Sequence, residues 1–444
     1  MITAPICEFV RRYRYSGALR MHMPGHKGTA LLGPEPLDLT EIEGADVLYH
    51  AEGIIRESEA NAAALFGTKK TVYSVEGSSL CIRAMLYLAL LHARANHKKP
   101  VIAAGRNAHK VFMTAAALLD LDIRWIYGTE SVISCAITPA QLEDVIVSEN
   151  PAAVYITSPD YLGNIADIKS LSTVCKKHGV LLLVDNAHGA YLHFLSEPMH
   201  PMQLGADICC DSAHKTLPVL TGGAYLHIAH GTPDMFAQRA ESAMALFAST
   251  SPSYLILQSL DAMNPLLATS FPAQLKACAE RLDTLKAMLR AHGYALCGEE
   301  RTKLCLLPKS FGYTGTALAE ILTHHNIYCE FSDADHLVMM FTPETAPADF
   351  ARLERALLSV LPAPAILSKP PVPPHAERVL SPREALFSPS ETLPLSECKN
   401  RILADANVSC PPAVPLAVCG ERLTPEVISA MEYYGTEHCT VVVE

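Results

Sequence analysis

A lysine between two apolar runs is the residue of this sequence with the most distinctive chemistry. Lys215 lies in the segment Asp211–Leu217, which follows the apolar run 206–210 and precedes the apolar run 222–228. Each run predicts a buried strand, so Lys215 is expected on a short loop held close to the core. Desolvation there favours the neutral amine, which can form a Schiff base. The alternative is a lysine on a surface turn, since charged residues lie mostly outside.

A carboxylate earlier in the chain supplies a chemical partner for this lysine. Asp185 ends the continuously apolar run 180–185, and His188 follows it closely. The carboxyl end of such a strand faces the crevice in which open α/β sheets bind ligands. An acid that holds a protonated pyridine nitrogen, together with Lys215, is the pair that pyridoxal 5'-phosphate (PLP) requires. His188 is expected either to contact cofactor or substrate or to cap the turn.

Hydroxyl groups at a predicted helix start offer an anion site. A predicted strand at 71–75 is followed by Gly77, Ser78 and Ser79, which open a long apolar helix. Free backbone N–H groups, the helix dipole and two hydroxyls suit the phosphate of PLP. Ser212, three residues before the lysine, is expected to reach the same phosphate. A plain helix cap is the alternative for the serines.

The remaining pattern predicts an α/β chain in which strands and helices alternate. The predicted helices and strands are listed together: helices over 55–66, 80–95, 110–119, 139–148, 168–178, 253–263 and 271–292, and strands over 71–75, 101–104, 123–127, 152–157 and 180–185. Residues 1–45 are expected to be irregular, and the proline-rich stretch 361–374 is expected to be a linker. Two histidines, His22 and His26, flank a Pro-Gly turn, but no carboxylate or thiol lies nearby at ligand spacing, so no metal site is predicted.

Composition limits the class of protein. Half of the 444 residues are hydrophobic and 18% are charged, as expected for a globular chain of two or three domains. The net charge of −11 argues against a nucleic-acid partner. The 14 scattered cysteines contain no CxxC pair and indicate reduced thiols, and no signal peptide or membrane span is visible. A cytoplasmic location is therefore expected.

Several motifs in order resemble the Orn/Lys/Arg decarboxylase family, most closely its short Gram-positive-type members. The motifs that carry the resemblance are Leu19–Lys27, Glu52–Ile55, Arg106–Lys110, Asp185–Ala190, Ser212–Leu217, Ser251–Tyr254, Ser381–Ala385 and Cys410–Pro415. The sequence departs from the family pattern at Glu76, where Asn is usual, at Ala213, where Thr is usual, and at Cys410, where Tyr is usual.

The resemblance implies a fold type I PLP-dependent enzyme like aspartate aminotransferase. It implies a large domain with a mostly parallel central sheet and a small α/β C-terminal domain. The expected divisions are an N-terminal arm (1–45), a large PLP-binding domain (46–265), a small α/β domain (266–360), a linker (361–376) and a C-terminal subdomain (377–444).

The resemblance also assigns residues beyond the lysine and the aspartate. His109 is expected to stack on the pyridine ring, the alternative being a solvent-facing histidine at a helix start. His214 is expected to bind the cofactor. Thr157 belongs to a loop expected to flank the cofactor and is a candidate substrate contact. Glu421 is a candidate for the cationic head group of the substrate, the alternative being a solvated loop glutamate.

The activity implied is α-decarboxylation by a carbon–carbon lyase, with arginine, lysine or ornithine giving the amine of a polyamine pathway and CO₂. A homodimer with shared active sites is expected, without a nucleic-acid or membrane partner. Two alternatives stay open: an aminotransferase or another lyase reaction on the same scaffold, and a catalytically silent relative with a binding role.

Overall fold

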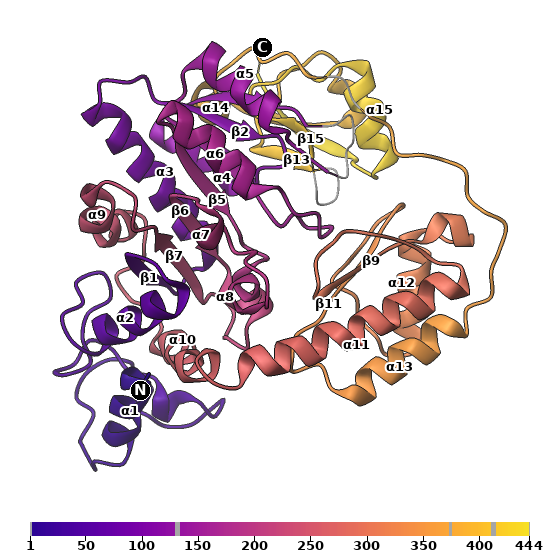
Figure 1. The fold of residues 1–444 in the computed structure, drawn as a ribbon. Coiled ribbons are helices and arrows are strands. Elements are labelled where there is room, and N and C mark those ends of the chain that lie inside the picture. The colour runs from indigo at the N-terminus through magenta and orange to yellow at the C-terminus, as the bar shows by residue number, and fades with distance from the viewer. Residues whose placement is uncertain (1, 129–133, 373–374, 410–413, 444) are drawn as a thin grey trace. The chain divides into compact units, whose positions relative to one another are not determined.

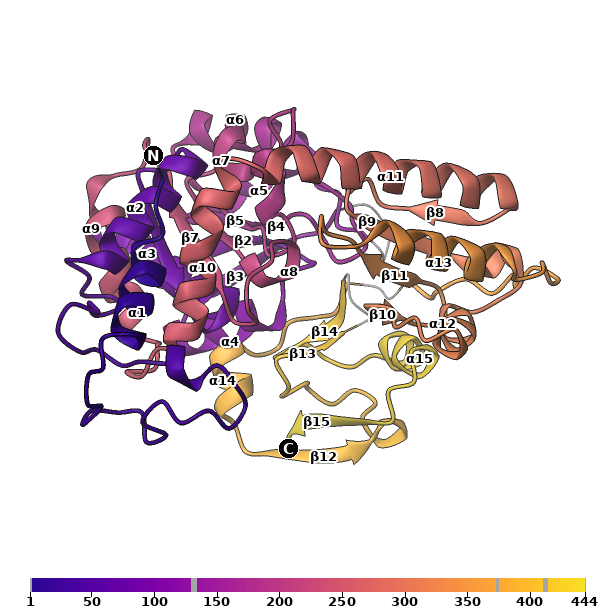
Figure 2. The ribbon, with the colours of Figure 1, turned by 90° about the horizontal axis from the view of Figure 1, so that it is seen from below.

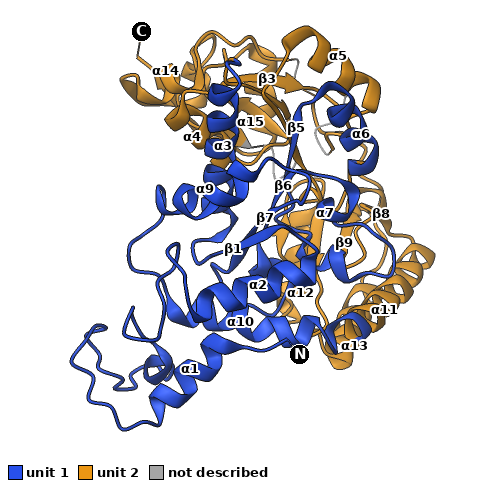
Figure 3. Ribbon diagram, turned by 60° about the vertical axis from the view of Figure 1, so that its left-hand side comes forward, with its two compact units in different colours: residues 1–98, 168–273 blue, residues 99–167, 274–444 orange. Residues whose placement is uncertain are grey.

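The chain divides into two compact units, each built from two separate stretches of sequence. A computed structural model describes residues 2–128, 134–372, 375–409 and 414–443. Unit 1 comprises residues 1–98 and 168–273, and unit 2 comprises residues 99–167 and 274–444 (Figure 3). The predicted domain boundaries follow the chain in order, whereas each of these units contains a large insertion. The five-part division made from the sequence stays a prediction.

Unit 1 contains four buried strands with helices around them. Its elements are α1 (Pro5–Arg14), the 3-10 helix η1 (Glu35–Leu37), α2 (Ile54–Phe66), β1 (Lys70–Ser74), α3 (Gly77–Ala95), α6 (Ile168–His178), β5 (Leu181–Asp185), η2 (Ala190–Phe194), α7 (Pro201–Leu204), β6 (Ile208–Asp211), α8 (Ala213–Thr216), β7 (Ala224–Ile228), α9 (Asp234–Ala245) and α10 (Tyr254–Leu267) (Figure 1). The strands lie in the order β1-β7-β6-β5. β5 and β6 are parallel, while β7 is antiparallel to both β6 and β1.

Unit 2 contains three parallel strands and a separate antiparallel sheet. Its elements are β2 (Val101–Gly105), α4 (Lys110–Leu119), β3 (Asp122–Ile126), α5 (Pro139–Glu149), β4 (Ala153–Thr157), most of α11 (Phe271–His292), β8 (Ala295–Cys297), β9 (Lys303–Leu307), η3 (Pro308–Phe311), α12 (Gly315–His324), β10 (Phe331–Ser332), β11 (Leu337–Met340), α13 (Pro347–Leu358), α14 (Pro382–Phe387), β12 (Ser390–Pro394), η4 (Leu395–Glu397), β13 (Asn407–Ser409), β14 (Pro415–Val418), α15 (Pro425–Tyr433) and β15 (His438–Val442). β2 pairs in parallel with both β3 and β4.

The strands of the central sheet form where the sequence is continuously apolar. Every residue of β2, β5, β6 and β7 is buried, as expected for strands covered on both faces. Parallel strands joined by helices define the α/β class with a mostly parallel central sheet, which confirms the predicted fold class.

The second sheet of unit 2 is antiparallel and packs against long helices. Its strands lie in the order β10-β11-β9-β8. Leucines of α11 and apolar residues of α13 share one hydrophobic core with this sheet, and Figure 2 shows the two helices side by side. Strands and helices therefore alternate through this part of unit 2. The pairs β12–β15 and β13–β14 with α15 form a further small core.

Two local predictions are wrong. Residues 1–45 are not all irregular, because Pro5 occupies the first turn of α1 and Ile6 and Val10 bury one face of that helix. Lys215 lies between two buried strands as predicted, but in the single-turn helix α8 instead of a short loop.

Two further stretches bear on the sequence predictions. Residues 361–372 contain neither helix nor strand, as their prolines predicted, while the motif residues Cys410–Ala413 lie outside the described residues. In the part of the chain that the structure describes, no helix combines the length and the apolar character needed to cross a bilayer.

Candidate active site

Lys215 and His188 meet at the carboxyl ends of neighbouring strands in unit 1. Lys215 follows β6 and His188 follows β5, and these strands are parallel. The lysine Nζ lies 3.2 Å from Nε2 of His188, whose side chain is buried. Parallel strands bring the residues after their carboxyl ends to one edge of the sheet, so two groups that are distant in sequence can exchange a proton.

Asp185 is the last residue of β5 and is buried at this edge. Its Oδ1 accepts hydrogen bonds from the backbone N–H of Ala187 at 3.2 Å and from the thiol of Cys210 at 3.7 Å. The carboxylate is therefore fixed in orientation at the point where the sequence predicted a partner for a pyridine nitrogen.

The amino end of α3 presents the predicted hydroxyl groups. Ser212 donates a hydrogen bond to Ser78 with 2.8 Å between the two hydroxyl oxygens, although they are distant in sequence. Gly77 has φ of +70° and donates its N–H to the carbonyl of Gly222 at 2.7 Å, which fixes the turn before the helix. Ser79 lies in the first turn of the same helix. The structure thus brings Ser78 and Ser212 together at a helix N-terminus, which is suited to a phosphate.

Glu76, the N-cap residue of α3, does not compete for that position. It is exposed, and its Oε1 accepts the backbone N–H of Ser249 at 2.8 Å. Its charge is therefore engaged by the segment that leads to α10.

We expect Ser78→Ala and Ser212→Ala each to weaken PLP binding about tenfold to a hundredfold, because a charge-assisted hydrogen bond contributes about 1.5–3 kcal/mol. Ser79→Ala is expected to weaken it as well. Fluorescence titration of the apoprotein with PLP measures the dissociation constants. Ser242→Ala is the control, since that exposed hydroxyl donates a hydrogen bond to the carbonyl of Arg239 in its own helix. Parent-like binding by all three variants would place the phosphate elsewhere.

His214 is oriented by its backbone surroundings. Its Nδ1 lies 2.9 Å from the carbonyl oxygen of Gly223, so Nδ1 carries the proton and donates it. Burial lowers the pKa of His214, with the charge of Lys215 acting in the same direction. The imidazole is therefore neutral near pH 7, with Nε2 left as an acceptor.

A buried carboxylate behind this edge was missed from the sequence. Asp211, at the end of β6, accepts hydrogen bonds from Nε2 of His200 at 2.9 Å, from Nε2 of His227 at 3.2 Å and from Asn186 at 2.7 Å. Burial raises its pKa, but the interactions with the two histidines outweigh burial, and the pKa lies below its usual range. The cluster fixes Asp211 and Asn186, the immediate neighbours of Ser212 and Asp185.

The same cluster resembles a metal site only by proximity. His200, Cys209 and Asp211 place ligand atoms within 4.8 Å of one another. However, Nδ1 of His200 accepts the N–H of Met202, so its proton lies on Nε2 and points at the carboxylate. A closed hydrogen-bond network accounts for this arrangement.

Unit 2 carries the remaining sequence candidates. His109 is exposed and caps α4, its Nδ1 accepting the N–H of Val111 at 3.3 Å. Thr157 ends β4, and its carbonyl accepts a hydrogen bond from Asn107 at 3.4 Å. The Oγ1 of Thr157 is buried without a hydrogen-bond partner among the described residues. The stacking role of His109 and the substrate role of Thr157 stay predictions.

Glu421 is bound by an arginine that the sequence reading did not pair with it. Arg106 donates two hydrogen bonds to the Glu421 carboxylate, at 2.7 and 2.8 Å, and both side chains are buried. The guanidinium also lies 4.9 Å from the ring centre of Trp125. Burial lowers the pKa of Arg106, but the charge of Glu421 outweighs it and raises the pKa. The alternative of a solvated loop glutamate is wrong.

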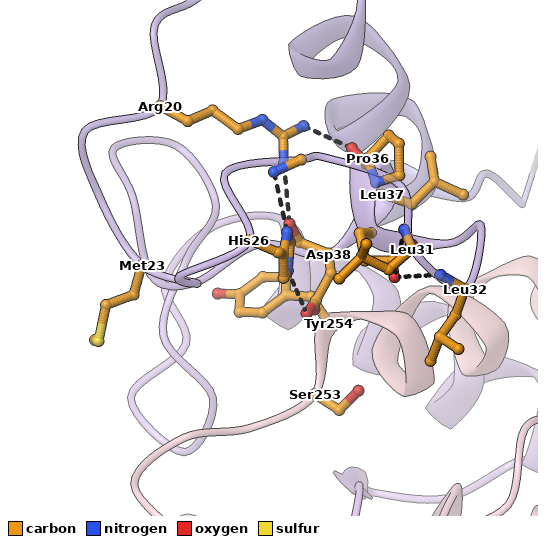
Figure 4. Close-up of polar contacts among 12 residues, drawn as sticks. Arg20, Met23, His26, Leu31, Leu32, Pro36, Leu37, Asp38, Ser253 and Tyr254 are labelled. Atoms are coloured by element: carbon orange, nitrogen blue, oxygen red, sulfur yellow. Dashed lines mark hydrogen bonds and ion pairs between the residues drawn. The ribbon is translucent and has the colours of Figure 1, made fainter.

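The predicted histidine turn is held by residues of unit 1 (Figure 4). The Nε2 of His26 lies 3.3 Å from the Asp38 carboxylate, and Arg20 donates to the carbonyls of Pro36 and Asp38. The Nε2 of His22 lies 2.6 Å from the Tyr13 hydroxyl. The two histidines therefore have separate partners.

The groups around Lys215 fit PLP. The lysine can bind the aldehyde of that cofactor, and the carboxylate can pair with its ring nitrogen. The hydroxyls at the helix start can bind its phosphate. The Oγ1 of Thr216, next to the lysine, is buried without a hydrogen-bond partner among the described residues, as expected beside a ligand. The fold and this set of groups define a PLP-dependent enzyme.

Comparison with known proteins identifies the kind of PLP enzyme. The family model for the Orn/Lys/Arg decarboxylase major domain matches residues 4–292. The chain belongs to the Orn/Lys/Arg decarboxylase family. The arginine decarboxylase of Bacillus subtilis (strain 168) is 31% identical over 463 residues, covering 96% of this chain and 92% of the relative. The arginine decarboxylase of Halalkalibacterium halodurans is 28% identical, covering 95% of this chain and 91% of the relative.

Solved structures share the fold. The constitutive lysine decarboxylase of E. coli matches with a TM-score of 0.79 at 16% identity, covering 100% of this chain and 82% of that chain. The Francisella novicida lysine decarboxylase LdcF matches with a TM-score of 0.80 at 16% identity, covering 100% and 81%. The protein is therefore a PLP-dependent decarboxylase of basic amino acids with the fold type I architecture.

Proposed function

We propose that this protein decarboxylates arginine, releasing CO₂ and agmatine. The observation that carries the choice of substrate is the full-length similarity to relatives named arginine decarboxylase. Lysine is the second candidate, because the solved structures with the same fold are named lysine decarboxylases. Ornithine, the third substrate in the family description, completes the set to be tested.

In the proposed reaction, the residues of unit 1 orient the reactants and hold protons. Bound PLP supplies an electron sink for the charge left on the α-carbon when CO₂ departs. Asp185 would pair with the ring nitrogen of bound PLP. The Nζ of Lys215 carries the proton for the α-carbon, and Nε2 of His188, 3.2 Å away, exchanges that proton. Ser78 and Ser212, whose hydroxyls lie 2.8 Å apart, would hold the phosphate.

Product analysis tests the proposed function and its alternatives. The holoenzyme is incubated separately with arginine, lysine and ornithine, and CO₂ and the amine are quantified. Arginine is expected to give the highest kcat/KM, with one CO₂ for each agmatine. A keto acid or ammonia in place of CO₂ would show an aminotransferase or another lyase. No turnover of any of the three by PLP-loaded protein would favour a silent relative.

We expect Asp185→Asn to retain PLP but to lose about thirtyfold to several thousandfold in kcat, because loss of a desolvated charge pair costs about 2–5 kcal/mol. The amide keeps the shape of the carboxylate and lacks its charge. Asp234→Asn is the control, since that carboxylate is mostly exposed. Near-normal kcat in Asp185→Asn would show that another group faces the ring nitrogen.

The homodimer with shared active sites stays a prediction. The segment 19–32 exposes large apolar side chains, among them Leu19, Met21, Leu31 and Leu32, which supports a covering partner. Sedimentation of the holoenzyme measures the assembly, and a monomer at micromolar concentration would contradict it.

A further inference from the structure

Two cysteines face each other across a hairpin of unit 2, outside the site described above. Cys297 on β8 and Cys305 on β9 are directly opposed partners in an antiparallel pair. Such partners have Cα atoms about 4.5–5.5 Å apart, within the range that a disulfide spans. Their sulfur atoms lie 3.0 Å apart and both residues are free thiols. Small side-chain rotations are enough to bring the sulfurs to bonding distance.

The two thiols differ in their surroundings. Cys297 is half-buried, whereas Cys305 is buried, so an oxidant reaches Cys297 first. The hydrogen bond with Cys305 lowers the pKa of Cys297, and the nearby charge of His336 acts in the same direction. The same hydrogen bond, together with burial, raises the pKa of Cys305. Cys297 is thus suited to attack an oxidant, and Cys305 is suited to form a disulfide with the oxidised Cys297.

The hairpin between the cysteines binds the loop that follows β4. The backbone N–H groups of Glu299 and Glu300 donate to the carbonyl of Gly163 at 2.7 and 3.0 Å. Lys303 donates to the carbonyl of Asp160 at 3.2 Å and is paired with Glu300 at 2.8 Å. A Cβ on Gly298 would approach the carbonyl oxygen of Leu162 to 2.3 Å, which shows how closely the two backbones approach.

The cysteines also contact this loop through their packing. Cys305 belongs to one small hydrophobic cluster with Leu162 and Val338, and Cys297 packs against that cluster. A change at the two sulfurs therefore acts on a hairpin that contacts residues 160–163 through backbone hydrogen bonds, the Lys303 side chain and core packing.

We propose that Cys297 and Cys305 form a redox-active dithiol, which hydroperoxides oxidise to an intrachain disulfide that holds the hairpin against residues 160–163. The Cys297 thiolate attacks one peroxide oxygen, the O–O bond breaks, and hydroxide leaves, so Cys297 becomes a sulfenic acid. The Cys305 sulfur then displaces that hydroxyl group, giving the disulfide and water. Two thiols and one hydrogen peroxide thus yield one disulfide and two waters.

The test is peptide mapping of the holoenzyme treated with hydrogen peroxide and then alkylated under denaturing conditions. Trypsin cleaves after Arg301 and Lys303, which lie between the cysteines, so a disulfide leaves two linked peptides that part on reduction. We expect these linked peptides, with a mass two hydrogens lower than the sum of the reduced pair. Cys297→Ser is expected to abolish them, and Cys305→Ser is expected to leave Cys297 as a sulfenic or higher oxide.

Two reference cysteines make the result specific. Cys135 and Cys329 are also half-buried, but the pKa of each is raised by burial. Oxidation of either one before Cys297, or linked peptides that join other cysteines instead, would overturn the proposal. A fully alkylated Cys297 and Cys305 after peroxide treatment would overturn it as well.

Amide hydrogen exchange tests the effect on the loop. In the oxidised protein, exchange at Glu299 and Glu300 is expected to slow relative to the reduced protein, because the closed hairpin opens less often. The Cys297→Ser variant, treated identically, is expected to show no such change. Unchanged exchange in a protein with the disulfide formed would overturn the proposal that the disulfide holds the hairpin against the loop. Neither readout depends on the proposed reaction.

Discussion

Lys215→Ala is expected to retain no PLP after borohydride reduction and denaturation, whereas the parent protein is expected to carry a pyridoxyl group on the peptide that contains Lys215. Decarboxylation should fall at least about 10²–10⁴-fold, the range lost when a positioned proton donor is removed. The lysine supplies both the covalent attachment and the proton at Nζ, and alanine supplies neither. Mass spectrometry of the reduced, digested protein measures the first effect and CO₂ release the second.

A matched lysine variant shows whether the effects are specific to Lys215 or follow from the loss of any lysine charge. Lys276→Ala removes an exposed lysine, so it should keep both the pyridoxyl peptide and the activity. A pyridoxyl group found on another lysine of Lys215→Ala, with turnover preserved, would assign the cofactor to that lysine instead.

Glu421→Ala is expected to lower the free energy of unfolding by about 3–5 kcal/mol, because the variant leaves the guanidinium of Arg106 buried without its carboxylate. Both side chains are almost fully buried, so water is not available to replace the lost partner. Urea denaturation followed by circular dichroism measures the change. KM for arginine, measured under conditions in which the variant remains folded, tests separately whether Glu421 also contacts the substrate.

A neighbouring ion pair provides the control. Arg422 and Glu377 form an exposed ion pair at 3.2 Å, and Glu377→Ala should cost less than about 1 kcal/mol. The double variant Arg106→Leu with Glu421→Leu should be more stable than either single variant, since it leaves no unpaired buried charge. A Glu421→Ala variant within about 1 kcal/mol of the parent would show that the pair is dispensable.

The helices and strands of the central region follow from local sequence. Apolar runs at 101–104 and 180–185 form β2 and β5, and the pattern at 110–119 and 168–178 forms α4 and α6 with the predicted limits. Burial on both faces requires an uninterrupted apolar run, which is visible without knowing the neighbours. The helix α1 was missed because only Ile6 and Val10 mark its buried face, among charged residues.

Part of the candidate site was also accessible from the sequence. The ends of predicted strands indicate where polar side chains converge. The sequence alone could therefore place Lys215 and His188 at one edge of the sheet, and likewise Ser78 and Ser212. Family resemblance added roles for residues such as His109, whose place in the reaction no contact in the structure tests.

The missed features depend on pairs that no local pattern reveals. Arg106 and Glu421 are 315 residues apart, and Asp211 meets His200 and His227 only through sheet register and a turn. Which polar residues pair inside a core is decided by the three-dimensional path of the chain. The pattern of a single sequence indicates which segment is buried, but it does not indicate which residue is its partner.

The pairing of β1 with β7 has a consequence for synthesis of the protein on the ribosome. The two strands are hydrogen-bonded neighbours, although about 150 residues separate them in the chain. At about 5–20 residues per second, β1 waits about 8–30 s for its neighbour. Throughout that interval its backbone N–H and C=O groups are open to strands of other nascent chains. Unit 1 therefore cannot complete its sheet until β7 has been synthesised, and the strand Lys70–Ser74, which is mostly buried in the folded chain, stays unpaired until then.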